Sequence, residues 1–220
     1  MTTRAFIITG TDTGIGKTVF AAALTQALSG TYWKPIQAGI SDGTDSQEVA
    51  RLTDNTSVTV APEVYCLTTP CSPHQAAAID NKSISLENIL AGHPKTDAPL
   101  IIEGAGGLLV PLSDTTLQIE LFAQLKQPLI ICARTALGTI NHSLLTVQAA
   151  KARNLDIAGI AFIGEENVET ERVITHFAQV PRLGRLPHIS DLKPTKLAEA
   201  FHQGFATWLD TVSTQTAKSQ

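Results

Sequence analysis

The segment Gly-Thr-Asp-Thr-Gly-Ile-Gly-Lys-Thr, residues 10–18, constrains the fold more than any other part of the sequence. It follows a short apolar run, residues 5–8, and leads into a helix-like stretch that begins at Thr18. The first N–H groups of a helix are free and the helix dipole favours anions there, so a phosphate group fits such a turn. Gly10 and Gly16 are separated by five residues, one more than in the usual P-loop.

Two side chains of this segment match the chemistry of nucleotide binding. Lys17 is expected to reach the terminal phosphates, and the Thr18 hydroxyl is expected to ligate Mg²⁺. The alternative interpretation is a glycine-rich turn that only begins a helix. The apolar run before the segment and the helix-like stretch after it favour a nucleotide site, because a P-loop requires that setting.

Short apolar runs without polar alternation predict strands that are buried on both faces. They lie at residues 5–8, 99–102, 128–133 and 157–163. Helix-like stretches at residues 18–30 and 140–152 lie between such runs, and Gly30 is expected to cap the first helix. This order predicts an α/β fold of the P-loop NTPase type, with a mostly parallel β-sheet and helices on both faces.

A chain of 220 residues is expected to form one domain. We predict that this domain covers residues 1–210 and that the polar residues 211–220 form a frayed tail. The glycine-rich turns after the apolar runs should lie at the carboxyl ends of the strands, where ligands bind in open α/β sheets.

Composition excludes several classes of partner. The chain has 20 acidic and 16 basic residues, a net charge of −4 and no basic run, so we expect no nucleic-acid or membrane surface. No apolar run approaches the length of about 18 residues that a membrane span needs. The cysteines are Cys66, Cys71 and Cys132, and their odd number and spacing fit neither disulfides nor a metal site. A reduced, cytoplasmic protein with a small-molecule partner is expected.

Three charged residues are candidates for the phosphate chemistry. Lys34 precedes Pro35, which favours an extended backbone at a strand end, although a surface lysine is the alternative. Asp45 follows a glycine-rich loop and could instead be a helix N-cap. Glu103 directly follows an apolar run. Carboxylates together with the Thr18 hydroxyl are the hard oxygen ligands that Mg²⁺ prefers.

Small residues and helix starts mark further candidate contacts. The glycines of residues 103–107 would let a substrate or phosphate approach the backbone, unless they form only a structural turn. Ser72 and Pro73 have the pattern of a helix N-cap and first helical residue. Residues 137–141 predict a further helix start whose N–H groups could hold a carboxylate, and a loop leading into a core helix is the alternative.

Taken together, these motifs resemble those of the dethiobiotin synthetase family. The long P-loop form Gly-Thr-Asp-Thr-x-x-Gly-Lys-Thr is matched at residues 10–18. Further matches, in the family's order, are Lys-Pro-Ile-Gln-Ala-Gly at 34–39, Ser-Pro-His at 72–74, Glu-Gly-Ala-Gly-Gly at 103–107, Pro-Leu-Ser-Asp at 111–114 and Leu-Gly-Thr-Ile-Asn-His at 137–142. They span most of the chain.

The resemblance implies specific site residues. It implies catalytic roles for Lys17 and Lys34, and an Mg²⁺ site formed by Thr18, Asp45 and Glu103. The implied nucleotide site consists of Gly14, Ile15, Gly16, Lys17, Thr18, Val19, Asp45, Glu103, Gly104, Ala105, Gly106, Pro187, His188 and Ile189. The implied substrate site consists of Thr11, Asp12, Lys34, Ala38, Ser72, Pro73, Gly106, Leu137, Gly138, Thr139, Ile140 and Asn141. In similar enzymes the 137–141 segment comes from the partner subunit, so a homodimer with its active sites near the interface is expected.

Three positions depart from the family pattern. Gly14 stands where the best-known members carry a glutamate, and Ala38 replaces a usual serine or threonine. Ile163 and Gly164 stand where many members have an Asn-Asp pair whose asparagine recognises adenine. The phosphate grip, both lysines and the metal ligands are retained, so the departures concern specificity. Main-chain groups near residues 185–189 could read the base instead.

The resemblance implies an ATP- and Mg²⁺-dependent cyclo-ligase. Its reaction would convert 7,8-diaminopelargonic acid, CO₂ and ATP into dethiobiotin, ADP and phosphate, through a carbamate and a carbamic-phosphoric anhydride. A partition-type ATPase switch is an alternative, but its signature lysine near the start of the loop is replaced by Gly10-Thr11-Asp12. A corrinoid amidase would share the P-loop pattern, but it carries an additional glutaminase domain.

Overall fold

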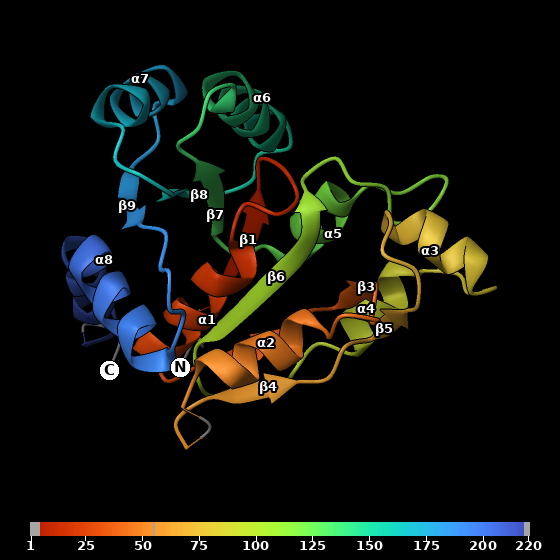
Figure 1. The fold of residues 1–220 in the computed structure, drawn as a ribbon. Coiled ribbons are helices and arrows are strands. Elements are labelled where there is room, and N and C mark those ends of the chain that lie inside the picture. The colour runs from red at the N-terminus through yellow and green to blue at the C-terminus, as the bar shows by residue number, and fades with distance from the viewer. Residues whose placement is uncertain (1–4, 55, 218–220) are drawn as a thin grey trace.

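The computed structural model describes residues 5–54 and 56–217. At its centre, seven parallel strands form one sheet in the order β4-β2-β6-β1-β7-β8-β9 (Figure 1). The strands are β1 (Ala5–Gly10), β2 (Thr31–Trp33), β4 (Thr59–Ala61), β6 (Leu100–Gly107), β7 (Leu129–Arg134), β8 (Ile157–Ile163) and β9 (Arg182–Leu186). The predicted α/β fold with a parallel sheet is therefore confirmed.

Helices cover both faces of this sheet, as Figure 1 shows. One face carries α1 (Lys17–Ala27), α2 (Asp45–Leu52) and α8 (Pro194–Ala217). The other carries α3 (Pro73–Ile79), α4 (Leu86–Ala91), α5 (Gln118–Leu125), α6 (Thr139–Ala152) and α7 (Val168–Ala178). A two-stranded parallel sheet, β3 (Ile36–Ala38) and β5 (Tyr65–Leu67), lies beside the main one.

Adjacent strand residues contribute to opposite cores. Ile7 belongs to the core beneath α3–α7, whereas Ile8 belongs to the core beneath α1, α2 and α8. Side chains alternate between the faces of a strand, so a strand covered on both faces must be apolar at every position. This explains why the apolar runs lack alternation.

The strand β6 is longer than predicted. The run at residues 99–102 was expected to end before a glycine-rich loop, but the strand continues to Gly107. Gly107 lies in register with Gly10 of β1, and Gln118 accepts a hydrogen bond from the Ala105 N–H at 2.6 Å. The backbone of this glycine-rich stretch is thus held as part of the sheet.

The prediction that Gly30 caps the first helix is wrong. Ser29, not Gly30, has the left-handed conformation after α1, with φ of 48°. The Gly30 N–H then donates to the Thr25 carbonyl at 2.9 Å. Gly30 is instead required by space, because a Cβ there would lie 2.5 Å from the Pro99 carbonyl oxygen.

The C-terminal helix α8 runs to Ala217, so residues 211–217 are helical where the sequence predicted a frayed tail. Residues 218–220 lie outside the described part. Within residues 5–54 and 56–217, none of the helices combines the length and the apolar character that crossing a bilayer would need.

Candidate functional site

The P-loop joins β1 to α1 at the carboxyl edge of the sheet. Gly14 and Gly16 have φ of 68° and 95°, the left-handed region that favours glycine. Ile15 between them is buried in the core, whereas residues 12–14 form an exposed crest. Gly16 is the N-cap of α1, so the Gly-Lys-Thr end of the loop lies at the start of this helix.

The Lys17 side chain extends back to this loop, where its Nζ donates to the Asp12 carbonyl at 2.9 Å. Its side chain is buried. Burial lowers the pKa of Lys17, although Glu103 opposes that effect. An ammonium group that is hydrogen-bonded to the loop in this way is in a position from which it can meet phosphate oxygens.

The Thr18 hydroxyl lies between two carboxylates from distant elements. Its Oγ1 lies 2.9 Å from Glu103 Oε1 and 3.1 Å from Asp45 Oδ1, so the two carboxylates share its single hydrogen. Asp45 is the first residue of α2, and Thr44 is the N-cap, with a capping box to Gln47. The N-cap alternative for Asp45 is thus wrong, and its carboxylate is free to face the P-loop.

Lys34 follows β2 directly and is only 4% exposed, so the alternative of a surface lysine is wrong. Its Nζ forms ion pairs with Asp45 Oδ2 and with Glu103 Oε1, the latter at 3.0 Å. Burial acts to lower the pKa of Lys34, but the charges of Glu103 and Asp45 outweigh it and raise the pKa above its ordinary value. The lysine is therefore a fixed positive charge at neutral pH.

Two side chains that the sequence analysis missed hold this cluster in place. The Tyr32 hydroxyl donates to Glu103 Oε2 at 2.9 Å. The pKa of Tyr32 is raised well above its ordinary value, mainly by burial and next by the negative charge of Glu103. Gln37 Oε1 accepts from the Asp45 N–H at 3.1 Å. Tyr32 could have been found, because it lies two residues before Lys34 and strand side chains two apart share a face.

A cleft of about 660 Å³ opens over this cluster. Predicted residues that line it are Gly14, Gly16, Lys17, Thr18, Val19, Lys34, Ala38, Asp45, Ser72, Pro73, Glu103, Ala105 and Gly106. Ser72 precedes α3 with its hydroxyl not used as a cap, and Pro73 is the first helical residue. Thr13, Pro70, Cys71 and Val110 also line the cleft and were not among the predicted residues.

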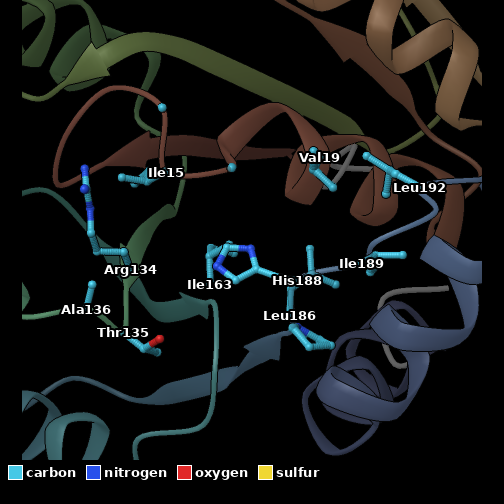
Figure 2. Close-up of a pocket in the computed structure, with 13 residues that line it drawn as sticks. Ile15, Val19, Arg134, Thr135, Ala136, Ile163, Leu186, His188, Ile189 and Leu192 are labelled. Atoms are coloured by element: carbon cyan, nitrogen blue, oxygen red, sulfur yellow. The ribbon is translucent and has the colours of Figure 1, made fainter.

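A second cavity, of about 430 Å³, lies on the other side of the P-loop (Figure 2). It is lined by Gly14, Ile15, Gly16, Val19, Arg134, Thr135, Ala136, Ile163, Leu186, Pro187, His188, Ile189 and Leu192. The predicted residues Pro187, His188 and Ile189 thus share one cavity with the P-loop. Figure 2 shows the His188 imidazole projecting into this space near Ile163.

Several predicted residues lie elsewhere. Thr11 and Asp12 line a separate hollow with Leu109 and Leu145, and Asp12 pairs with Arg134 at 2.8 Å. Gly104 faces α5, since a Cβ there would lie 2.6 Å from the Phe122 ring.

Residues 137–141 are absent from the lining of both cavities beside the P-loop. Thr139 begins α6 and is buried, whereas Leu137 is fully exposed and Gly138 is the N-cap. This segment therefore does not complete the cleft of its own chain, which leaves its predicted substrate contact without support within one subunit.

The donor set fits a divalent cation that is shared with a nucleotide. No group of three or more His, Cys, Asp or Glu side chains with metal-binding geometry occurs among the described residues. The cluster offers the Thr18 hydroxyl and the carboxylates of Asp45 and Glu103, all hard oxygen donors. Mg²⁺ commonly uses one or two carboxylates and takes its other ligands from water and phosphates, so this small set is sufficient.

Known proteins resemble this chain over most of its length. Residues 4–196 match the family model described as an AAA domain. The ATP-dependent dethiobiotin synthetase BioD of Nitrobacter hamburgensis is 57% identical over 94% of this chain and 96% of its own length. The enzyme of the same name from Agrobacterium fabrum is 56% identical over 91% of this chain and 93% of its own.

Solved structures show the same fold at low identity. The septum site-determining protein MinD of Pyrococcus horikoshii, complexed with Mg-ADP, has a TM-score of 0.59 and 16% identity, and the match covers 90% of this chain and 86% of that one. A ParA family ATPase from Chlorobium tepidum has a TM-score of 0.58 and 14% identity, over 94% and 97% of the two chains. These likenesses concern the fold alone.

Proposed function

The chain belongs to the family of ATP-dependent dethiobiotin synthetases, and from this membership we propose that it forms dethiobiotin in biotin biosynthesis. The proposed reaction joins 7,8-diaminopelargonic acid and CO₂ with hydrolysis of ATP to ADP and phosphate. One observation carries the proposal for the site: Lys17, Thr18, Lys34, Asp45 and Glu103 converge on one cleft beside the P-loop.

The first step is capture of CO₂ by one amine of the substrate, which loses a proton and becomes a carbamate. Lys34 is proposed to bind the carbamate, because its buried ammonium group borders the cleft. A positive charge in a low-dielectric site stabilises such an anion more than it would in water.

In the second step a carbamate oxygen attacks the γ-phosphorus of ATP, ADP leaves, and a carbamic-phosphoric anhydride forms. Lys17 and the P-loop N–H groups are proposed to hold the phosphates, and Lys34 to stabilise the charge that develops on the transferred group. Thr18, Asp45 and Glu103 would hold Mg²⁺, which neutralises phosphate charge when it is bound. Phosphoryl transfer depends mainly on positioning and electrostatics, so no protein nucleophile is required.

In the last step the second amine attacks the carbamoyl carbon, phosphate leaves, and the amine releases a proton as the ureido ring closes. Holding the amine beside the activated carbon makes ring closure intramolecular. The small residues Ala105 and Gly106 border the cleft and allow a substrate to approach the backbone.

We further propose that the active form is a homodimer in which residues 137–141 of one subunit reach the cleft of the other. Exposed apolar side chains support this assembly, namely Leu109, Leu137, Ile140 and Leu145. Leu109 and Leu145 line a hollow with Thr11 and Asp12, so the exposed surface adjoins the P-loop crest. A partner that covers it would bring its own 137–141 segment near that crest.

A cytoplasmic location is proposed because Cys66, Cys71 and Cys132 are all free thiols.

The base of the nucleotide is proposed to occupy the cavity of Figure 2, where Ile163 and its neighbours form an apolar wall and His188 offers a polar group.

The proposed reaction is tested by phosphate release from ATP with Mg²⁺ and bicarbonate, with and without 7,8-diaminopelargonic acid. Release that depends on the diamine, with dethiobiotin as the second product, is the expected result. Slow release that is indifferent to the diamine would contradict the ligase function and favour a nucleotide switch. Repeating the assay with CTP and GTP ranks the nucleotides.

A further inference from the structure

Tyr32 lies in the middle of β2, and its side chain is completely buried. Its hydroxyl donates a hydrogen bond to Glu103 Oε2 at 2.9 Å. Glu103 itself is only 1% exposed. A buried carboxylate oxygen has no access to bulk water, so the contact with Tyr32 matters to how that carboxylate is held.

The two oxygens of Glu103 have different partners. Oε1 accepts from Thr18 Oγ1 at 2.9 Å and from Lys34 Nζ at 3.0 Å. Oε2 accepts from the Tyr32 hydroxyl. The two oxygens are chemically equivalent, but any rotation short of a half-turn would break both sets of bonds at once, so the Tyr32 contact fixes the plane of the carboxylate.

The backbone fixes this pairing. Tyr32 is in register with Ile101 in the parallel pair formed by β2 and β6. Glu103 lies two residues after Ile101, and residues two apart in a strand share a face. Tyr32 and Glu103 are therefore diagonal neighbours on the same face of the sheet, within reach of a long side chain.

We propose that Tyr32 is a positioning residue that orients Glu103 for the divalent cation of the nucleotide complex. The inference rests on the proposed function, because it takes Glu103 as part of the Mg²⁺ site. Tyr32 touches neither nucleotide nor substrate in this role. It acts by holding Oε2, so that Oε1 is presented beside the Thr18 hydroxyl.

The test compares Tyr32→Phe with the unchanged full-length protein, with Mn²⁺ as the spectroscopic probe. Electron paramagnetic resonance measures the Kd of Mn²⁺ for the protein saturated with ADP. We expect Tyr32→Phe to weaken Mn²⁺ binding about tenfold or more, as loss of an outer partner of a metal ligand commonly does. The Mg²⁺ concentration that half-saturates turnover should rise by a similar factor. At saturating Mg²⁺, the kcat of Tyr32→Phe should return to the value of the unchanged protein.

Tyr65→Phe is the matched control. Tyr65 is the other tyrosine of the chain, and its hydroxyl accepts from the Ser85 N–H at 3.0 Å and from Asn88 Nδ2 at 3.2 Å. It lies in β5 and does not line the cleft. Loss of the Tyr65 hydroxyl should leave the Kd of Mn²⁺ unchanged. Tyr32→Phe with a lowered Tm but an unchanged Kd would overturn the positioning role.

Glu103→Gln separates failure of this inference from failure of the proposed site. If Glu103→Gln leaves Mn²⁺ binding intact, the assignment of Glu103 to the metal is wrong, and the inference falls with it. If Glu103→Gln weakens Mn²⁺ binding and Tyr32→Phe does not, only the positioning role is wrong. In the double variant, Tyr32→Phe should add little to the loss caused by Glu103→Gln, because both act through one carboxylate. Additive losses would overturn the inference.

Discussion

The hydroxyl of Thr18 lies 2.9 Å from Oε1 of Glu103, although the two residues are 85 positions apart in the sequence. Thr18 lies in the first turn of α1, after the P-loop, and Glu103 lies within β6, the strand that pairs with β1. The parallel pairing of these two strands brings their carboxyl ends to one edge of the sheet. Lys34 reaches the same point from β2 on the other side of β6.

Lys34→Ala should reduce kcat by about 10²-fold to 10³-fold, the usual cost of removing one preorganised charge from the transition state. ADP affinity, measured by calorimetry, should change little, because the P-loop keeps Lys17. Lys82→Ala is the control, since Lys82 is exposed and donates to the Cys66 carbonyl away from the cleft. Unchanged turnover in Lys34→Ala would remove this lysine from the reaction.

If the protein forms the proposed homodimer, subunits that carry different defects should complement each other. A Lys17→Ala subunit is paired with a Gly138→Val subunit, whose left-handed φ of 91° a valine does not tolerate. Each homodimer should be inactive. A heterodimer should recover about half of the wild-type activity, because one cleft then has an intact Lys17 and an intact 137–141 segment from its partner. Verified heterodimers without recovery would show that the sites are not shared.

ATP affinity should fall as the pH rises through the alkaline range. Burial lowers the pKa of Lys17, so the free protein loses this charge at a lower pH than an exposed lysine would. Phosphates raise the pKa again, and binding above the lowered pKa therefore takes up a proton and weakens with pH. Calorimetry in buffers of different ionisation enthalpy measures the uptake. Lys17→Arg keeps its charge and should show a flat affinity profile; an equal slope in both proteins would contradict the role of Lys17.

Gln118→Ala should destabilise the protein by about 1 kcal/mol in urea unfolding, because the part-buried Ala105 N–H loses its acceptor. The buried Gln118 side chain accepts from the Ala105 N–H at 2.6 Å and donates to the Gly107 carbonyl at 2.9 Å. Gln124→Ala, an exposed position on the same helix, is the control. The KM for the diamine should rise only in Gln118→Ala, since the glycine-rich part of β6 borders the cleft. Equal stability of the two variants would show that Gln118 is not needed to hold β6.

Ile163→Asn should sharpen the choice of nucleotide. Ile163 lines the cavity in Figure 2, and its apolar side chain offers a base no hydrogen bond. A carboxamide there should raise the ratio of kcat/KM for ATP over that for CTP by about tenfold, the effect of one net hydrogen bond of about 1.4 kcal/mol. Ile163→Val keeps the apolar wall and should leave the ratio unchanged. The same ratio in Ile163→Asn would place the base elsewhere.

The elements that could be predicted are those whose signals lie within a few residues. The P-loop pattern of residues 10–18, the apolar runs of the buried strands and the helix start at Pro73 each depend on neighbouring positions. Hydrophobic burial on both faces of a strand and the free N–H groups of a helix start require nothing from distant parts of the chain. The sequence by itself therefore determined the fold class and the chemistry of the loop.

Tertiary structure decided which of the candidate side chains meet. Asp45 is the first residue of α2 rather than its cap, because Thr44 and Gln47 form the capping box. Residues 137–141 do not complete the cleft of their own chain, and Tyr32 reaches Glu103 only because β2 lies beside β6 in a particular register. Strand order and register arise from the packing of the whole core, so a pairing across 71 positions leaves no local trace in the sequence.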